Sequence, residues 1–173
     1  MSGLYAPWFS GAVLAIGAIF FYPGRDYVLV GLMLFLPLLD RRWLPPSLPR
    51  ARIYHLLWVC LFAIAALLLI WQPQLGRFAL GTLLLAAVPE EWFFRAYFMP
   101  RMGRGWRANL IASLLFSLLH GLVHGGMVAL QVFIPSLFYG WLYQRTKDLP
   151  LLILVHALSN LVFVMFIGRF LAA

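Results

Sequence analysis

Long apolar runs separated by short polar segments occupy almost the whole chain. The runs cover residues 4–22, 26–40, 53–72, 77–100, 107–124, 126–144 and 149–170. A bilayer core needs roughly 20 mostly apolar residues per helix, and most of the runs approach or reach that length. They are too long for barrel strands, and backbone groups inside lipid must pair within their own segment, which leaves helices. The pattern predicts an all-α fold, a polytopic transmembrane bundle of about seven helices, in one domain over residues 1–173.

Composition supports a membrane protein and argues against a soluble one. Hydrophobic residues make up 64% of the chain and charged residues only 10%, whereas soluble domains have roughly 45–50% and about 25%. The one cysteine, Cys60, lies inside an apolar run, so no intramolecular disulfide can form. The excess of basic residues resembles that of nucleic-acid-binding proteins. Because most of these residues lie in short loops between apolar runs, they indicate membrane topology, and we expect a lipid bilayer and no nucleic acid as partner.

The distribution of basic residues orients the bundle. With the N-terminus in the cytoplasm, nine of the basic residues fall in cytoplasmic loops and three on the opposite side, which follows the positive-inside rule. The nine are Arg41, Arg42, Arg50, Arg52, Arg101, Arg104, Arg107, Arg145 and Lys147, and the three are Arg25, Arg77 and Arg169. Trp43, in the proline-rich stretch 40–52, is predicted to lie along the membrane interface. The first run has no basic segment before it and no evident cleavage site, so we interpret it as a retained span.

The only two glutamates, Glu90 and Glu91, are adjacent and lie in the middle of the fourth run. A charge at the bilayer centre costs at least about 2.5–3.5 kcal/mol, so such residues are usually functional. Arg95 is four residues after Glu91, and the two can form a structural pair that joins helices. Glu90 points about 100° away on a helix and is left without that partner. Pro89 removes a helical hydrogen bond just before Glu90 and can open the helix there.

Three histidines also fall inside predicted spans. His120 and His124 are four residues apart on the fifth long run, and His156 is followed one turn later by Asn160. At about 1.5 Å per residue, Glu90, His120 and Asn160 lie roughly 15–20 Å from the cytoplasmic helix ends, and His156 about 10 Å. These groups can therefore meet in one layer of the bundle. His124 falls at the outer helix end, so we expect it to be peripheral, with at most a secondary role.

This set of residues suits hydrolysis of an amide bond by water. A carboxylate beside an imidazole can hold a water molecule and take its proton, and a second histidine with an asparagine offers donors to a developing oxyanion. Such an enzyme needs no covalent intermediate. Serine catalysis is less favoured because no G-x-S-x-G elbow is present, and Cys60 lies far along the chain from the polar residues.

A zinc-dependent mechanism is the alternative to activation of water by protein side chains alone. His120, His124, His156 and Glu90 offer nitrogen and oxygen ligands, and two histidines four residues apart on a helix are a known metal spacing. The H-E-x-x-H motif is missing, and His124 lies toward the outer surface. We therefore predict no cofactor, with Glu90, His120 and His156 as the ligands if a metal is required.

Three motifs in order resemble a known family. Glu90-Glu91-x-x-x-Arg95, Phe116-x-x-x-His120 and His156-x-x-x-Asn160 are similar to the motifs of the CPBP intramembrane proteases. That family includes the type II CAAX prenyl proteases and the bacteriocin-processing and immunity (Abi) proteins. The resemblance covers roughly residues 86–162, and the first three runs match only as membrane spans.

The resemblance implies a glutamate-type intramembrane endopeptidase. Glu90 and His120 would activate water, His156 and Asn160 would form the oxyanion hole, and Glu91 and Arg95 would support them. The substrate would be a membrane-associated protein or peptide. The short chain resembles a minimal bacterial member, of the kind paired with JDVT-CTERM sorting tails, in the inner membrane.

Two functions without proteolysis are also compatible with buried polar residues. A proton-coupled carrier buries glutamate, histidine and arginine, although the sequence shows no inverted repeat or pair of interrupted segments. A non-catalytic scaffold or immunity protein would retain the same residues for packing.

Overall fold

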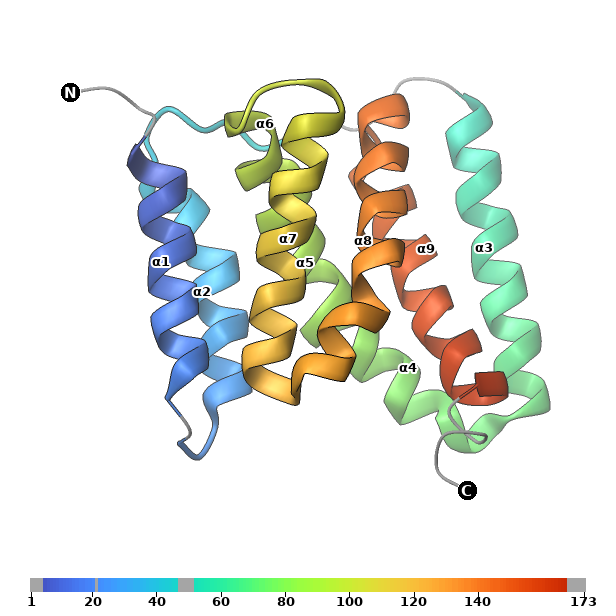
Figure 1. Cartoon of the computed structure of the whole chain (residues 1–173). Coiled ribbons are helices and arrows are strands. Elements are labelled where there is room, and N and C mark those ends of the chain that lie inside the picture. Colours follow the sequence, from blue (N-terminus) through green and yellow to red (C-terminus); the bar gives the residue numbers. More distant parts are fainter. Residues whose placement is uncertain (1–4, 21, 47–51, 168–173) are drawn as a thin grey trace.

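A computed structural model describes residues 5–20, 22–46 and 52–167, and these form helices connected by short turns (Figure 1). The predicted runs 4–22 and 149–170 each extend beyond the described residues. The basic residues Arg50 and Arg169 lie outside the described residues. Within the described residues there are seven helical rods and no strands, which confirms the predicted all-α fold. The rods are α1 (Tyr5–Ile19), α2 (Arg25–Leu39), α3 (Arg52–Trp71), a central helix over 73–101, α7 (Gly105–His124), α8 (Gly126–Thr146) and α9 (Leu149–Val162) with a π-helical extension, η4 (Phe163–Ile167).

The central helix is irregular around its two glutamates. It consists of η1 (Pro73–Leu75), α4 (Gly76–Thr82), η2 (Leu83–Ala87), α5 (Val88–Glu91), η3 (Trp92–Phe98) and α6 (Met99–Arg101). The η2 and η3 segments are wider π-helical turns on either side of the short α5. Pro89 lacks an N–H and crowds the carbonyl four residues back, so a regular α-helix is disfavoured there. Turns of this kind are frequent at functional sites because they displace side chains from the regular helical register.

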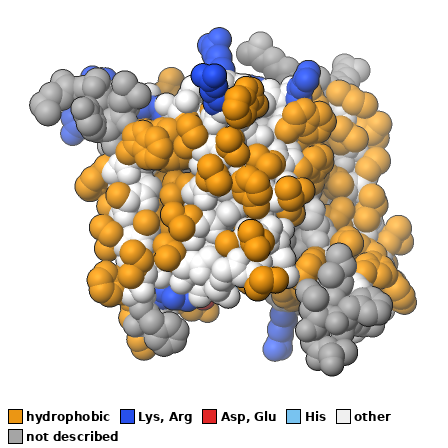
Figure 2. Space-filling view, viewed as in Figure 1, with side chains coloured by type: hydrophobic (Ala, Val, Ile, Leu, Met, Phe, Trp, Pro, Cys, Tyr) orange, Lys and Arg blue, Asp and Glu red, His pale blue; other side chains and the backbone are white. Residues whose placement is uncertain are grey.

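Successive rods run in alternating directions, so their connections gather at two ends (Figure 1). One end carries the connections after α2, α6 and α8, and the other carries the α1–α2 and α7–α8 turns. Among the described basic residues, those of the first end are Arg41, Arg42, Arg52, Arg101, Arg104, Arg107, Arg145 and Lys147, and those of the second are Arg25 and Arg77. We call these the arginine-rich end and the opposite end. Blue side chains project from both ends in Figure 2, and orange apolar ones cover much of the surface between them.

Helix length and hydropathy support membrane insertion. Among the described residues, four helices are long and apolar enough to cross a bilayer: Ile53–Trp71, Gly105–His124, Gly126–Thr146 and Leu149–Phe166. α1 and α2 have 15 residues each, which is short for a bilayer core that needs roughly 20. Large apolar side chains are exposed along most of the helices. In water such a surface would aggregate, so it fits contact with lipid.

Two side chains near the arginine-rich end make contacts that the sequence did not indicate. The indole Nε1 of Trp43 donates to the carbonyl of Ala96 at 3.1 Å, and its ring packs edge-on against Trp92. Asp148 is a helix-end residue but is fully buried. It caps α9 by accepting from the Leu151 N–H, and the indole of Trp58 donates to it at 2.9 Å, which joins α3 to α9.

Buried aromatic side chains of the central helix form part of the core of the bundle. Phe93, Tyr97 and Phe98 of η3 are 0% exposed, and the Phe93 ring packs against the rings of the other two. α7 and α8 are the most closely packed pair, and the side chain of Asn109 lies directly against Gly140 and donates to the Leu137 carbonyl at 2.8 Å. Close packing through small residues is typical of membrane helices. The central helix packs against α7 and α9, and these three elements carry the predicted site residues.

Candidate active site

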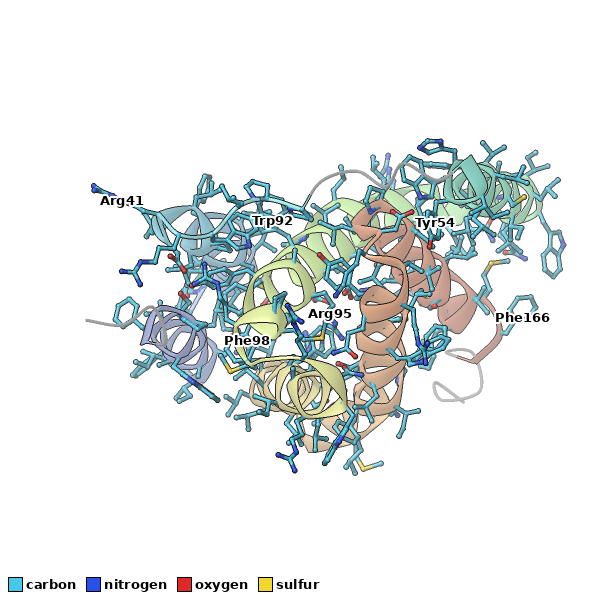
Figure 3. The ribbon with its side chains drawn as sticks, turned by 90° about the horizontal axis from the view of Figure 1, so that it is seen from above. Arg41, Tyr54, Trp92, Arg95, Phe98 and Phe166 are labelled. Carbon is cyan, nitrogen blue, oxygen red and sulfur yellow. The ribbon has the colours of Figure 1, made fainter. Side chains whose placement is uncertain are left out.

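Glu91 and Arg95 form a fully buried ion pair on the central helix. Arg95 Nε lies 3.3 Å from Glu91 Oε2, and both side chains are 0% exposed. Figure 3 shows Arg95 in the middle of the molecule, with α1 and α2 on one side and α3 on the other. The spacing of four residues predicted this contact. A buried pair of this kind needs further hydrogen bonds, because desolvation otherwise outweighs the attraction between the charges.

Helix α8 and helix α7 supply part of that support. Arg95 Nη2 donates to the Ser136 hydroxyl at 2.7 Å and to the Ser136 carbonyl at 3.0 Å. The guanidinium carbon also lies 4.9 Å from the centre of the Phe116 ring, a cation–π distance. Arg95 thus connects the central helix, α7 and α8 from within the bundle.

His156 of α9 connects to both glutamates. Its Nδ1 donates to Glu91 Oε1 at 2.7 Å, and its Nε2 lies 3.7 Å from Glu90 Oε2. Tyr139 of α8 stacks on the ring at 4.8 Å between centroids. One nitrogen is therefore engaged by Glu91 and the ring plane is fixed, so Nε2 is the nitrogen that remains available on the side of Glu90.

Glu90 lies between two histidines without a direct hydrogen bond to either. Its Oε1 is 3.8 Å from His120 Nε2, and its side chain is 13% exposed, against 0% for Glu91. Both distances exceed a normal hydrogen bond and suit a bridging water. His120 Nδ1 donates to the Phe116 carbonyl at 3.0 Å. In the neutral ring, that bond leaves a lone pair on Nε2, which faces Glu90.

A cavity of about 190 Å³ lies next to Glu90 and His120. It is bounded by α1, α2, the central helix and α7, and its polar walls also include Asp26 and His124. His124 was expected to be peripheral. It is exposed at the end of α7, yet its ring centre lies 6.0 Å from that of His120 and it faces the same cavity.

Asn160 is the predicted site residue whose role stays a prediction without a contact to support it. It lies on α9 one turn beyond His156 and is half-buried, and its side chain makes no hydrogen bond to the described residues. Whether a metal takes part also stays a prediction. Within the described ranges, no group of three or more histidine, cysteine, aspartate or glutamate side chains converges on a position for a metal ion. Glu90, His120 and His156 are close to one another without sharing such a position.

Comparison with protein families decides the classification. The model of the type II CAAX prenyl endopeptidase Rce1-like family matches residues 72–162, which is more than half of the chain. The chain belongs to this family. No curated protein and no solved structure matches it. The match begins just before the central helix and ends with α9, so it contains the glutamates, Arg95 and the intramembrane histidines, whereas the cavity wall that α1 and α2 form lies outside it.

Membership in the type II CAAX prenyl endopeptidase family confirms the resemblance seen in the three motifs. It makes the chain an integral membrane hydrolase, an intramembrane endopeptidase of the CAAX type whose substrate is a membrane-associated peptide. The individual roles of the site residues stay a prediction.

Sequence reasoning missed two residues of this family member's site. Ser136, which holds Arg95, and Tyr139, which stacks on His156, both come from α8, where no site residue was predicted. Ser136 follows Pro135 within an apolar helix, and Tyr139 is three residues later on the same face. That spacing is the only signal in the sequence, and serine and tyrosine are too common in membrane helices for it to be specific.

Proposed function

We propose that the protein cleaves a peptide bond of a membrane-associated substrate with a water molecule activated by Glu90 and His120. The observation that carries the proposal is the position of the Glu90 carboxylate, 3.8 Å from His120 Nε2, 3.7 Å from His156 Nε2 and beside a cavity. A carboxylate and an imidazole at this spacing can hold one water between them. The central helix, α7 and α9 are required together to create this arrangement.

The first step is attack by water. The water donates one hydrogen bond to Glu90 and a second to the lone pair on His120 Nε2. Its oxygen bonds to the carbonyl carbon of the substrate while one proton passes to Glu90. General-base assistance of this kind contributes about 10²–10⁴-fold to a rate.

The second step is collapse of the tetrahedral intermediate. His156 Nε2–H, with the ring protonated at both nitrogens, and the Asn160 amide donate to the oxyanion. The C–N bond then breaks, and the proton held by Glu90 passes to the leaving nitrogen. The products are a new carboxyl terminus and a free amine. Glu91 and Arg95 act indirectly, because Glu91 orients His156 and Arg95 holds Glu91 in place.

The proposed orientation of the protein in the membrane follows from the distribution of its basic residues. The arginine-rich end is assigned to the cytoplasm, with the N-terminus on that side, in the inner membrane of a bacterium. No cofactor takes part in the scheme, and neither the mechanism nor the surface requires nucleic acid.

Cleavage of a labelled peptide tests the function. Purified protein in detergent is incubated with a quenched fluorescent peptide of apolar residues, and the same preparation in liposomes is assayed for ion flux. Cleavage without flux is expected. Flux without cleavage would establish a carrier, and neither activity would establish a scaffold or immunity protein.

Metal removal is predicted to leave activity intact. If Glu90 and His120 activate water unaided, strong chelators have no metal to remove, and elemental analysis shows well under one zinc per chain. One tightly bound zinc, with activity lost on chelation and restored on its return, would favour the metalloprotease alternative.

Asn160→Ala is predicted to lower kcat by about 10²–10³-fold, the usual effect of removing one oxyanion donor, with little change in KM. The bond strengthens only in the transition state, so substrate binding is spared. Asn160→Asp should be at least as damaging, because it places a negative charge against the oxyanion. A raised KM at unchanged kcat would make Asn160 a binding residue, and no change in either constant would reduce its role to packing.

A further inference from the structure

The two histidines that face Glu90 are held by the same kind of contact. His120 packs on the Phe116 ring, with the ring centroids 4.2 Å apart and the planes inclined by 34°. His156 packs on the Tyr139 ring at 4.8 Å and 27°. In both histidines, Nδ1 bonds to an oxygen acceptor and Nε2 lies on the side of Glu90. Each imidazole thus has one face covered by an aromatic ring and one nitrogen directed toward the carboxylate.

The two aromatic rings come from different places in the fold. Phe116 lies one turn before His120 on the same helix, α7, and belongs to the Phe-x-x-x-His motif. Tyr139 belongs to α8, whereas His156 belongs to α9. The second contact therefore exists only because α8 packs against α9, in front of which it passes in Figure 1. Tyr139 covers its histidine as Phe116 does, from another helix and outside the three motifs.

Contacts on α8 and α9 hold Tyr139 in place. The buried residues of α8 fall on one face and are Ser136, Tyr139, Gly140 and Tyr143. One turn before Tyr139, the Ser136 hydroxyl accepts a hydrogen bond from Arg95 at 2.7 Å, which fixes α8 to the central helix. The phenol group of Tyr139 also interacts with the side chain of Ser159, one turn beyond His156 on α9. Tyr139 is therefore held at both ends of its side chain.

An aromatic face suits the state of His156 that the proposed second step requires. In that step the ring is protonated at both nitrogens, and Nε2–H donates to the oxyanion. The negative face of an aromatic ring attracts a cation that lies against it, which an aliphatic side chain does not. Glu91 accepts from Nδ1 at 2.7 Å and supplies the opposite charge. The stacked ring also keeps the imidazole from turning, so Nε2–H stays on the side of Glu90.

We propose that Tyr139 is a positioning residue for the cleavage reaction, whose ring holds His156 in the orientation and charge state that stabilise the oxyanion. The hydroxyl of Tyr139 is dispensable, because the Ser159 hydroxyl already donates to the Val155 carbonyl at 2.7 Å. The inference rests on the proposed function, since it takes His156 as an oxyanion donor. It gives α8 a part in the reaction, although this helix carries none of the three motifs.

Two substitutions separate the ring from the hydroxyl. Tyr139→Leu removes the aromatic face, and Tyr139→Phe keeps that face and removes only the hydroxyl. Tyr143→Leu is the matched control, because Tyr143 lies one turn later on α8, is also 4% exposed, and has its ring beside Lys147. For each variant, kcat and KM are measured per folded molecule with a quenched fluorescent peptide.

Tyr139→Leu is expected to lower kcat by about 10²-fold, the usual cost of a misplaced catalytic group, with little change in KM. Tyr139→Phe should retain most of the activity, and Tyr143→Leu should lose stability without losing turnover. An unchanged kcat in Tyr139→Leu, or an equal loss in Tyr139→Phe, overturns the proposal. If Tyr139→Leu does not fold, Tyr139→Met replaces it, because methionine fills irregular gaps. Failure of both to fold, where Tyr143→Leu folds, would show a structural role and overturn the proposal as well.

Proton NMR tests the positioning without requiring turnover. The Nδ1–H of His156, donated to Glu91 Oε1 at 2.7 Å, should give a signal far downfield, which His156→Gln removes and thereby assigns. Exchange of this proton with water is expected to be about tenfold faster or more in Tyr139→Leu, and unchanged in Tyr139→Phe and Tyr143→Leu. Equal exchange in Tyr139→Leu and the wild type overturns the proposal. Because no substrate is present, this result stands apart from failure of the proposed function, which a fully active Glu90→Gln variant would reveal.

Discussion

Glu90→Gln is expected to abolish peptide cleavage in a protein that still inserts, purifies and unfolds as the wild type does. Glutamine has nearly the same size as glutamate, so the half-buried position between His120 and His156 is filled as before. Its amide cannot accept a proton from water, and kcat/KM should fall by at least about 10²–10⁴-fold, the contribution of a general base. Initial rates with a quenched fluorescent peptide measure the loss, and thermal unfolding in the same detergent measures the fold.

Glu91→Gln is the informative comparison for Glu90→Gln, because the two positions are adjacent and the substitution is the same. Glu91 holds Arg95 and His156, so its loss should lower yield and thermal stability before it lowers turnover per folded molecule. Turnover near that of the wild type in Glu90→Gln would refute the proposed general base. Equal losses of stability in both variants would show that the two glutamates share one structural role.

Arg95→Ala should have the largest effect on stability, lowering the free energy of unfolding by about 3–5 kcal/mol, because it leaves the buried Glu91 carboxylate without its charged partner. The variant also loses two hydrogen bonds to Ser136 and the contact with Phe116, which together connect three helices. Unfolding in mixed detergent with increasing denaturant, followed by circular dichroism, measures the change.

Arg77→Ala is the matched control for Arg95→Ala, since Arg77 is an exposed arginine on the same central helix. It should change stability little, because single exposed charges contribute little. The double variant with Glu91→Gln and Arg95→Ala should be more stable than Arg95→Ala alone, since no unpaired buried charge remains. Wild-type stability in Arg95→Ala would show that the pair does not hold the bundle together.

The helices were predictable because each has a strong local signal. Membrane insertion requires long apolar runs, and the structure places its helices within a few residues of those runs, from Tyr5–Ile19 at one end to Leu149–Val162 at the other. The Glu91–Arg95 contact was predictable for the same reason, since a spacing of four residues puts two side chains on one helix face. The family followed from three short motifs and was confirmed by the match over 72–162.

Contacts between distant segments were less predictable. The hydrogen bond from His156 to Glu91, across 65 residues, depends on how α9 crosses the central helix, and a hydrophobic pattern does not encode that angle. Burial of Asp148 depends on Trp58 of α3 reaching it, and the place of His124 in the cavity depends on α2 lying beside α7. Polar residues inside a membrane bundle pair across helices, so their partners appear only when the packing is known.

Direct attack by water is the central claim, and mass spectrometry of the reaction in water labelled with heavy oxygen tests it most directly. The purified protein and an apolar peptide are mixed at near-equal concentrations and quenched with acid at intervals through the first turnover. The account predicts one heavy oxygen atom in the new carboxyl terminus and a protein mass that stays unchanged at every time point. A protein mass increased by that of the amino-terminal peptide fragment would reveal a covalent intermediate and contradict the account.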